Sequence, residues 1–189
     1  MPAPARSATA LAAARHPYRT AARTTARSRT RKGGRKGGSR KTALRRGTRK
    51  HAAIAKLVGL ARCPPKAPKY VRHCFDALQA RKLRLVAAEV AYCTRSHNGI
   101  IDLVAVALPG APAGSRTTVI EVKTINAKRA AWEAELARNP AGRRAVDARR
   151  AQAQVACYKH HGPYANPDAM LLYVFQDGVL LCRSTGSTP

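Results

Sequence analysis

Hydrophobic and polar positions alternate with two different periods along the chain, and this difference separates strands from helices. Residues 98–106 and 118–124 are apolar runs of strand length that are rich in β-branched side chains, and a segment rich in Pro, Gly and Ser lies between them. This pattern predicts two adjacent strands joined by a loose loop, as in a hairpin. Residues 85–93 form a third apolar run in which Glu89 is the only charge, and they predict a further strand before the hairpin.

Helical spacing of the apolar residues marks three other segments. Between residues 69 and 83 they recur three or four positions apart, which predicts an amphipathic helix. Asn126 is the expected N-cap of a second helix, and residues 143–160 predict a third helix. Two short strands, at 169–175 and 179–183, are expected on either side of an Asp-Gly turn.

The order of these elements is helix, three strands, two helices and two strands. It predicts an α/β sandwich with a central mixed sheet that is antiparallel at its start and covered by helices. Three prolines within residues 64–68 stop any helix that arrives from the N-terminal side. We therefore expect the folded domain to span residues 63–189, with its boundary at Cys63.

The charge of the chain is concentrated toward its N-terminal end. Residues 1–62 contain 18 Lys and Arg and no acidic residue, whereas residues 63–189 contain 18 Lys and Arg and all 9 Asp and Glu. A net charge of +27 calls for a polyanionic partner, and nucleic acid is the usual one. An anionic membrane surface is the alternative, but no long apolar segment spans or anchors anything, so we expect DNA as the partner and no membrane.

Residues 1–50 are a low-complexity sequence of Ala, Arg, Thr, Ser, Gly and Lys with few large apolar side chains. Such a sequence cannot bury a core, so we expect residues 1–62 to form a disordered basic tail that binds DNA phosphates. The residues expected to contact phosphates include Arg31, Lys32, Arg35 and Lys36. This composition favours a protein of the nucleus or of a viral nucleoprotein, and a transit peptide for the mitochondrion is the alternative.

The five cysteines are widely scattered and form no Cys-x-x-Cys pair. This spacing matches neither a zinc site nor a disulfide framework. We therefore expect reduced and mostly buried thiols.

Three charges interrupt the hairpin strands: Asp102 on the first strand, and Glu121 and Lys123 on the second. Side chains alternate between the two faces of a strand, so Glu121 and Lys123 share one face and Val122 lies on the other. Two carboxylates and an ammonium group on otherwise buried strands are costly if they are unpaired. A divalent metal held by Asp102 and Glu121, with Lys123 beside it, would compensate them and create a hydrolytic site. A cross-strand ion-pair face open to water is the alternative.

Four sequence features, together with the order of the elements, resemble the PD-(D/E)XK nuclease superfamily, and in particular its RecB-like, Cas4-like and viral alkaline exonuclease branch. The features are Glu89, the Gly-Ile-Ile-Asp segment that ends at Asp102, the Glu-Val-Lys triplet at 121–123, and the pair Gln154 and Tyr158. The resemblance covers about residues 69–183. Two departures are visible. Ile101 stands where the superfamily's name has a proline, and the scattered cysteines do not provide the iron–sulfur ligands of some branch members.

The resemblance implies a restriction-endonuclease-like α/β sandwich and a nuclease that needs Mg²⁺ or Mn²⁺. Asp102 and Glu121 would hold the ion together with the backbone carbonyl of Val122, since hard oxygen ligands suit these metals. Glu89 would support that ion or a second one.

The remaining implied roles concern Lys123, Gln154 and Tyr158. Lys123 would orient or help to deprotonate the attacking water. Gln154 and Tyr158 are four residues apart, so they share a helix face and can reach the site or the DNA backbone together. Four arginines of the same expected helix either contact phosphates or form a solvated face: Arg143, Arg144, Arg149 and Arg150.

We therefore expect a metal-dependent DNA nuclease, namely an exonuclease or end-processing enzyme of recombination, repair or replication. A structure-selective endonuclease and a non-catalytic basic DNA-binding or packaging protein are the alternatives. The joint presence of Glu89, Asp102, Glu121 and Lys123 argues against the non-catalytic protein, which has no need of all four.

Overall fold

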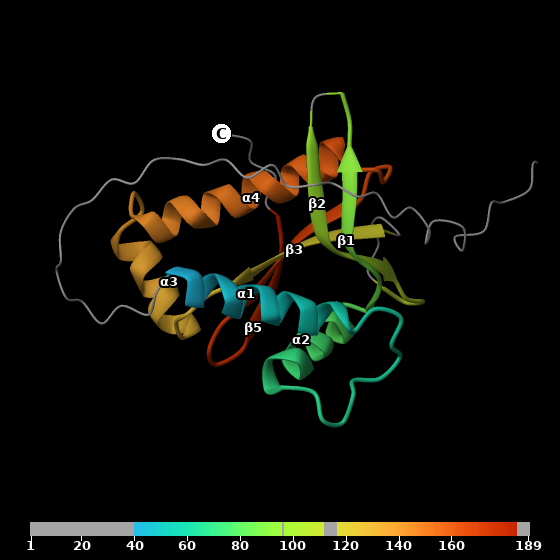
Figure 1. The fold of residues 1–189 in the computed structure, drawn as a ribbon, viewed down its shortest axis with the longest axis horizontal. Coiled ribbons are helices and arrows are strands. Elements are labelled where there is room, and N and C mark those ends of the chain that lie inside the picture. Colours follow the sequence, from blue (N-terminus) through green and yellow to red (C-terminus); the bar gives the residue numbers. More distant parts are fainter. Residues whose placement is uncertain (1–39, 96, 112–116, 185–189) are drawn as a thin grey trace, which may run out of the picture. The chain divides into compact units, whose positions relative to one another are not determined.

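The protein is described from a computed structural model, which covers residues 40–95, 97–111 and 117–184, with side chains from residue 45 onward. All of these residues belong to one compact unit that begins at Gly38. Figure 1 shows its elements, which in chain order are α1 (Arg40–Ala55), α2 (Lys69–Ala80), β1 (Leu83–Cys93), β2 (Asn98–Ala107), β3 (Thr117–Thr124), α3 (Arg129–Arg138), α4 (Arg143–His161), β4 (Asp168–Val174) and β5 (Val179–Arg183). The expected strands and helices are present, and α1 is an additional element.

The strands form a mixed sheet in the order β1-β2-β3-β4-β5. Neighbours from β1 to β3 are antiparallel, β3 and β4 are parallel, and β5 is antiparallel to β4. A parallel pair requires a long crossover connection, and α3 and α4 supply it between β3 and β4. The expectation of an α/β sandwich with a mixed sheet that starts antiparallel is therefore confirmed.

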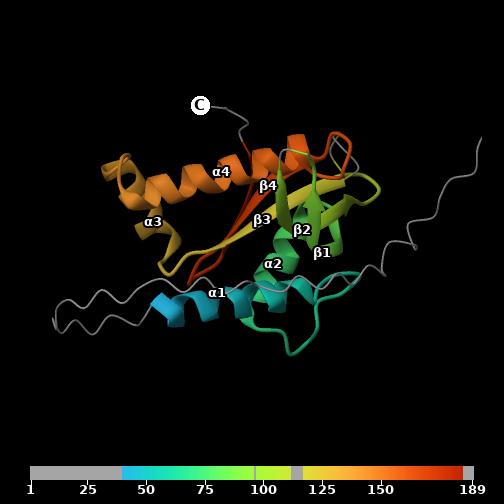
Figure 2. The same ribbon diagram turned by 45° about the horizontal axis from the view of Figure 1, so that its top comes forward.

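Helices cover both faces of the sheet, as Figure 2 shows. On one face, Ile54 near the end of α1 and Leu78 of α2 belong to a cluster with inward-facing residues of every strand. On the other face, Trp132 of α3 and Val155 of α4 pack with a second set of strand residues. Because the sheet is buried on both faces, a polar side chain on its central strand β3 needs a partner from a helix or from a neighbouring strand.

The N-terminal boundary of the folded part differs from the expectation. Residues 40–55 form α1, and Ile54 and Leu57 are 0% and 2% exposed within the core. The cations Arg45, Arg46 and Arg49 are exposed, so they stay solvated while the other side of the helix packs. The expected boundary at Cys63 is therefore wrong, and residues 40–62 belong to the fold. Residues 1–39, with the four expected phosphate contacts, lie outside the described part of the chain.

The expected N-cap at Asn126 is also wrong. The helix α3 begins at Arg129, and Lys128 precedes it as N-cap without a side-chain hydrogen bond. The capping interaction comes from the β4–β5 turn, where Asp177 Oδ1 accepts a hydrogen bond from the backbone N–H of Arg129 at 3.0 Å. Asn126 Oδ1 instead accepts a hydrogen bond from Gln176 Nε2 at 3.0 Å. A cap from a distant turn satisfies the same orphan N–H group as a local one, but it is invisible in the local sequence.

All five cysteines lie in the described part and are free thiols. Only Cys74 is buried, three are half-buried and Cys93 is exposed, so the expectation of mostly buried thiols holds for one of them. Burial raises the pKa of the Cys74 thiol to about 12. Among the described helices, none combines the length and the apolar character that crossing a bilayer demands.

Candidate functional site

The site lies where β2 and β3 separate. Backbone pairing of these strands runs from Val106 and Thr117 to Leu103 and Ile120. One position further, Asp102 Oδ2 accepts a hydrogen bond from the backbone N–H of Val122 at 2.8 Å. Figure 1 shows the far end of the β1–β2 hairpin turning away from β3. The Asp102 carboxylate thus satisfies an N–H group that the departing strand leaves without a ladder partner.

Glu121 is the most deeply buried charged side chain of the described residues, with 2% of its surface exposed. Lys123 Nζ forms an ion pair with Glu121 Oε1. The Tyr158 hydroxyl, which comes from α4, lies 2.7 Å from Glu121 Oε2. Both carboxylate oxygens therefore have a partner, as a buried charge requires.

Gln154 and Tyr158 join this pair through one face of α4. Lys123 Nζ donates to Gln154 Oε1 at 3.0 Å, and Gln154 Nε2 donates to the Tyr158 oxygen at 2.6 Å. The Tyr158 hydroxyl also lies 2.8 Å from the backbone oxygen of Ile100, and its single proton can serve either this oxygen or Glu121 at one time. The expectation that Gln154 and Tyr158 share a helix face is confirmed, and so is the common face of Glu121 and Lys123, since Val122 packs in the core on the other side.

The pKa values follow from this burial. Burial raises the pKa of Glu121, and the nearby charge of Asp102 raises it further, whereas Lys123 and the Tyr158 hydrogen bond act in the opposite direction. Burial, and then the hydrogen bond to Glu121 and its charge, raise the pKa of Tyr158. Tyr158 therefore keeps its proton at neutral pH and remains a donor. Asp102 on the neighbouring strand therefore opposes ionisation of Glu121, and Lys123, which pairs with Glu121, favours it.

His51 is a site residue that the sequence analysis missed. Its Nδ1 lies 3.7 Å from Asp102 Oδ1. Gly47 precedes it by one helical turn, and a Cβ at Gly47 would lie 3.3 Å from the Thr124 hydroxyl oxygen. The glycine therefore lets α1 approach β3 closely, and His51, on the same helix face, reaches the site. The i, i+4 spacing of Gly47 and His51 places both on one face of a helix. This spacing was not used as a signal because residues 1–62 were expected to be a disordered tail.

Glu89 does not join the group. It is exposed, with a backbone φ of 52°, and its side chain forms no hydrogen bond or ion pair with any described residue. In the register of β1 and β2 its neighbours Ala88 and Val90 pair with Leu103 and Ile101, so its backbone lies opposite Asp102. The left-handed φ interrupts the alternation of the strand at this position. The structure thus brings together Asp102, Glu121, Lys123, Gln154 and Tyr158 and adds His51, whereas the Glu89 side chain is exposed and makes no hydrogen bond or ion pair with this group.

The donor set fits a small divalent cation in its chemistry. Asp102 and Glu121 offer carboxylate oxygens, Val122 offers a backbone carbonyl and His51 an imidazole nitrogen; hard oxygen donors favour Mg²⁺ or Mn²⁺. Burial, and then the charge of Asp102, raise the pKa of Glu121, and a divalent cation beside both carboxylates would favour their ionised forms. Across the described ranges, no three His, Cys, Asp or Glu side chains already converge as a metal-binding group.

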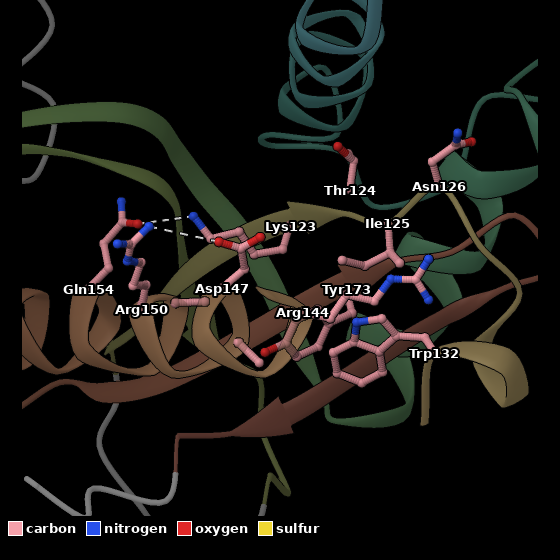
Figure 3. A pocket seen from close by; sticks show the side chains of 12 residues that line it. Lys123, Thr124, Ile125, Asn126, Trp132, Arg144, Asp147, Arg150, Gln154 and Tyr173 are labelled. Carbon is pink, nitrogen blue, oxygen red and sulfur yellow. Dashed lines mark hydrogen bonds and ion pairs between the residues drawn. The ribbon is translucent and has the colours of Figure 1, made fainter. Parts of the chain in front are cut away.

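The four arginines of α4 divide into two pairs. Arg144 Nη1 lies 2.5 Å from Glu135 Oε2, and Arg150 Nη1 lies 3.9 Å from Asp147 Oδ1; both line a pocket of about 580 Å³ next to Lys123 and Gln154 (Figure 3). Arg143 and Arg149 do not line it. Arg149 donates to the Pro140 oxygen at 2.9 Å, and the Arg143 side chain is 90% exposed.

No protein-family model matches this chain, and no curated protein matches it either.

The buried Glu121 should make the stability of the protein depend on pH. Its pKa is raised in the folded state, so its contribution to stability is present below the ordinary Glu value of 4.5 and is lost as pH rises through the raised value. In chelator, Glu121→Gln should therefore gain stability relative to the parent as pH rises above 4.5. Urea unfolding followed by circular dichroism between about pH 4 and 8 measures this difference.

Glu133→Gln is the matched control, because Glu133 is a carboxylate on α3 whose side chain is 47% exposed. Its stability relative to the parent should change little over the same pH range. The raised pKa of Glu121 would be contradicted if the difference in unfolding free energy between Glu121→Gln and the parent stayed constant with pH. It would also be contradicted if the variant lost stability relative to the parent at high pH.

Proposed function

We propose that the protein is a metal-dependent nuclease that hydrolyses phosphodiester bonds of DNA, as an exonuclease or end-processing enzyme. The observation that carries the proposal is the continuous contact from Lys123 to the buried Glu121, with Asp102 on the neighbouring strand. An exposed ion-pair face would not bury Glu121 to 2% or place the Tyr158 hydroxyl on its second carboxylate oxygen. Structural ion pairs cost stability when buried, so their presence at a strand separation favours a functional role.

The resemblance to the PD-(D/E)XK superfamily supports the same proposal. Asp102, the Glu121–Lys123 triplet, Gln154 and Tyr158 carried that resemblance in the sequence, where they are up to 56 positions apart. In space they form one hydrogen-bonded group between β2, β3 and α4. Independent surface residues would not be expected to converge in this way. Glu89, which lies apart from the group, has no part in the proposal.

Asp102, Glu121, the Val122 carbonyl and His51 would hold Mg²⁺ or Mn²⁺. The ion would neutralise charge on the phosphate oxygens and make water a better nucleophile. The Asp102 carboxylate, fixed by the Val122 N–H at 2.8 Å, is oriented before any ligand arrives. Tyr158 fixes the second oxygen of Glu121 in the same manner at 2.7 Å. Hydrogen bonds of the protein therefore orient both carboxylates.

Lys123 is the residue that acts on the reacting water in this proposal. Its ammonium group is held between Glu121 and Gln154, and its side chain is 34% exposed, so it reaches the open side of the site. From there it can orient the water and stabilise negative charge that grows on the phosphate. Gln154 is a positioning residue, since its amide touches Lys123 and Tyr158 and links the two.

The test is incubation of the purified full-length protein with end-labelled linear DNA and with circular DNA, in Mg²⁺ and in excess chelator. We expect cleavage of linear DNA in Mg²⁺ or Mn²⁺ and none in chelator. Cleavage of circular DNA as well would identify an endonuclease. Binding without cleavage, or full activity in chelator, would contradict the proposal, and the first of these results would identify a packaging protein.

Asp102→Asn tests the metal by a route that does not depend on activity. A ligand at about 100 times its Kd stabilises a folded protein by about 2.7 kcal/mol, so Mg²⁺ should raise the melting temperature of the parent. The variant removes one of the two carboxylates that would bind the ion, and its melting temperature should rise far less. Equal shifts for parent and variant would place the ion elsewhere.

A further inference from the structure

A pocket of about 580 Å³ opens beside the candidate site, and two residues belong to both. Lys123 and Gln154 line its near end, and Trp132 lies at the opposite end, as Figure 3 shows. Its wall comes from the end of β3, the helices α3 and α4, and β4. The lining residues are Lys123, Thr124, Ile125, Asn126, Trp132, Arg144, Asp147, Ala148, Arg150, Ala151, Gln154 and Tyr173.

The lining combines cations with an apolar wall. Lys123, Arg144 and Arg150 contribute three positive charges and Asp147 one negative charge, so the pocket carries a net charge of +2. Asp147 is shared, since Arg143 and Arg150 both lie 3.9 Å from its carboxylate. Glu135, which pairs with Arg144 at 2.5 Å, does not line the pocket. A ligand that suits this lining is anionic at one part and flat and apolar at another.

The apolar wall is rigid. The Trp132 ring packs against Tyr173 and Phe175, with ring centroids 5.0 and 5.4 Å apart, and Trp132 is 7% exposed. Ile125, Ala148 and Ala151 continue the same surface. A rigid apolar wall can hold a nucleobase at little cost in side-chain entropy.

We propose that this pocket binds one unpaired nucleotide of the DNA strand that enters the candidate site. The inference rests on the proposed function and adds the strand state of the substrate to it. Arg150, at the end of the pocket next to Gln154, binds the phosphate of this nucleotide, and the base lies on the wall formed by Ile125, Trp132 and Tyr173 (Figure 3). The volume lies within the range of about 300–1,000 Å³ that single small ligands occupy. A base within a duplex is stacked and paired, so it must leave the stack before it can enter such a pocket.

Trp132 is the only tryptophan of the chain, so its fluorescence reports on this pocket directly. The full-length protein is titrated in chelator, which prevents cleavage, with a single-stranded tetranucleotide of thymidine and with closed circular duplex DNA. We expect a saturable change in Trp132 fluorescence with the tetranucleotide, and a much smaller change with the duplex. An equal or larger change with the duplex would overturn the proposal.

Two arginines of α4 provide a matched pair of variants. Arg143 and Arg150 both lie 3.9 Å from Asp147, but only Arg150 lines the pocket. Arg150→Ala should weaken tetranucleotide binding about tenfold, the effect of losing one charge-assisted contact, whereas Arg143→Ala should change it less than about twofold. If both variants weakened tetranucleotide binding equally, binding would depend on net charge alone, and the pocket assignment would be wrong.

The outcomes separate this inference from the proposed function. Cleavage in Mg²⁺ without a fluorescence change on tetranucleotide binding overturns the pocket assignment and leaves the nuclease standing. A fluorescence change that depends on Arg150, in a protein that does not cleave DNA, overturns the nuclease and leaves a single-strand-binding pocket.

Discussion

Replacing Lys123 with alanine should lower the rate of DNA cleavage by about 10³-fold, the combined loss expected for a positioned proton-transfer group and a cation at the developing charge. The reason lies in the geometry of the group. No other described cation contacts Glu121, and the Lys123 ammonium is the one that bridges Glu121 and Gln154. The rate is measured with end-labelled linear DNA at saturating protein and low salt. A cleavage rate of Lys123→Ala within tenfold of the parent rate would contradict the proposed mechanism.

Two further variants separate lost chemistry from lost structure. Lys123→Ala leaves the buried Glu121 without its counter-charge and so lowers stability at neutral pH. Glu121→Gln should also abolish cleavage, but in chelator its stability relative to the parent should increase as pH rises above 4.5, because it carries no buried carboxylate to ionise. Lys66→Ala removes the same charge from an exposed loop position and should cleave like the parent. Loss of activity in the two site variants alone therefore identifies chemistry.

Deleting residues 1–37 should reduce the salt dependence of DNA binding strongly. This segment contains 10 Lys and Arg and no acidic residue, so its removal takes +10 of the +27 charge. A parent that neutralises about 6–10 phosphates loses about 10³–10⁵ in affinity between 50 and 200 mM salt, and the truncated protein should show a shallower slope and weaker binding. Neither form should show sequence preference, since phosphate contacts carry no sequence information. Binding and cleavage are measured for both forms over a salt series.

The choice of residue 37 follows from the structure, and a longer deletion is the control. The compact unit begins at Gly38, and α1 contributes Ile54 to the core and His51 to the site. Deletion of residues 1–62 should therefore abolish cleavage and destabilise the fold, whereas deletion of 1–37 should retain cleavage at low salt. Equal salt slopes for the parent and the shorter deletion would mean that the tail does not contact DNA, which would favour a targeting role. Loss of cleavage in the shorter deletion at low salt would place part of the tail in the site.

The spacing of apolar residues along the sequence was enough to predict most of the strands and helices. The β-branched runs of β1, β2 and β3 and the helical spacing of α2 and α4 are local signals, because the side-chain period of an element is a property of its own backbone. The same local rule placed Glu121 and Lys123 on one face and Gln154 and Tyr158 on another, and the structure joins these two faces.

Only the tertiary structure decided where the fold begins and which residues complete the site. The apolar face of α1 is short and lies among cations, so its sequence resembles a tail until Ile54 and Leu57 find partners across the sheet. His51 enters the site for the same reason, since its distance to Asp102 depends on how α1 packs on β3. Glu89 shows the converse: its position in an apolar strand suggested a site residue, but its φ is left-handed at 52° and its side chain is exposed, without a hydrogen bond or ion pair to the group. The periodicity of an element depends on residues that are neighbours in the chain. Contacts between distant side chains depend on how several segments pack together, so no single segment predicts them.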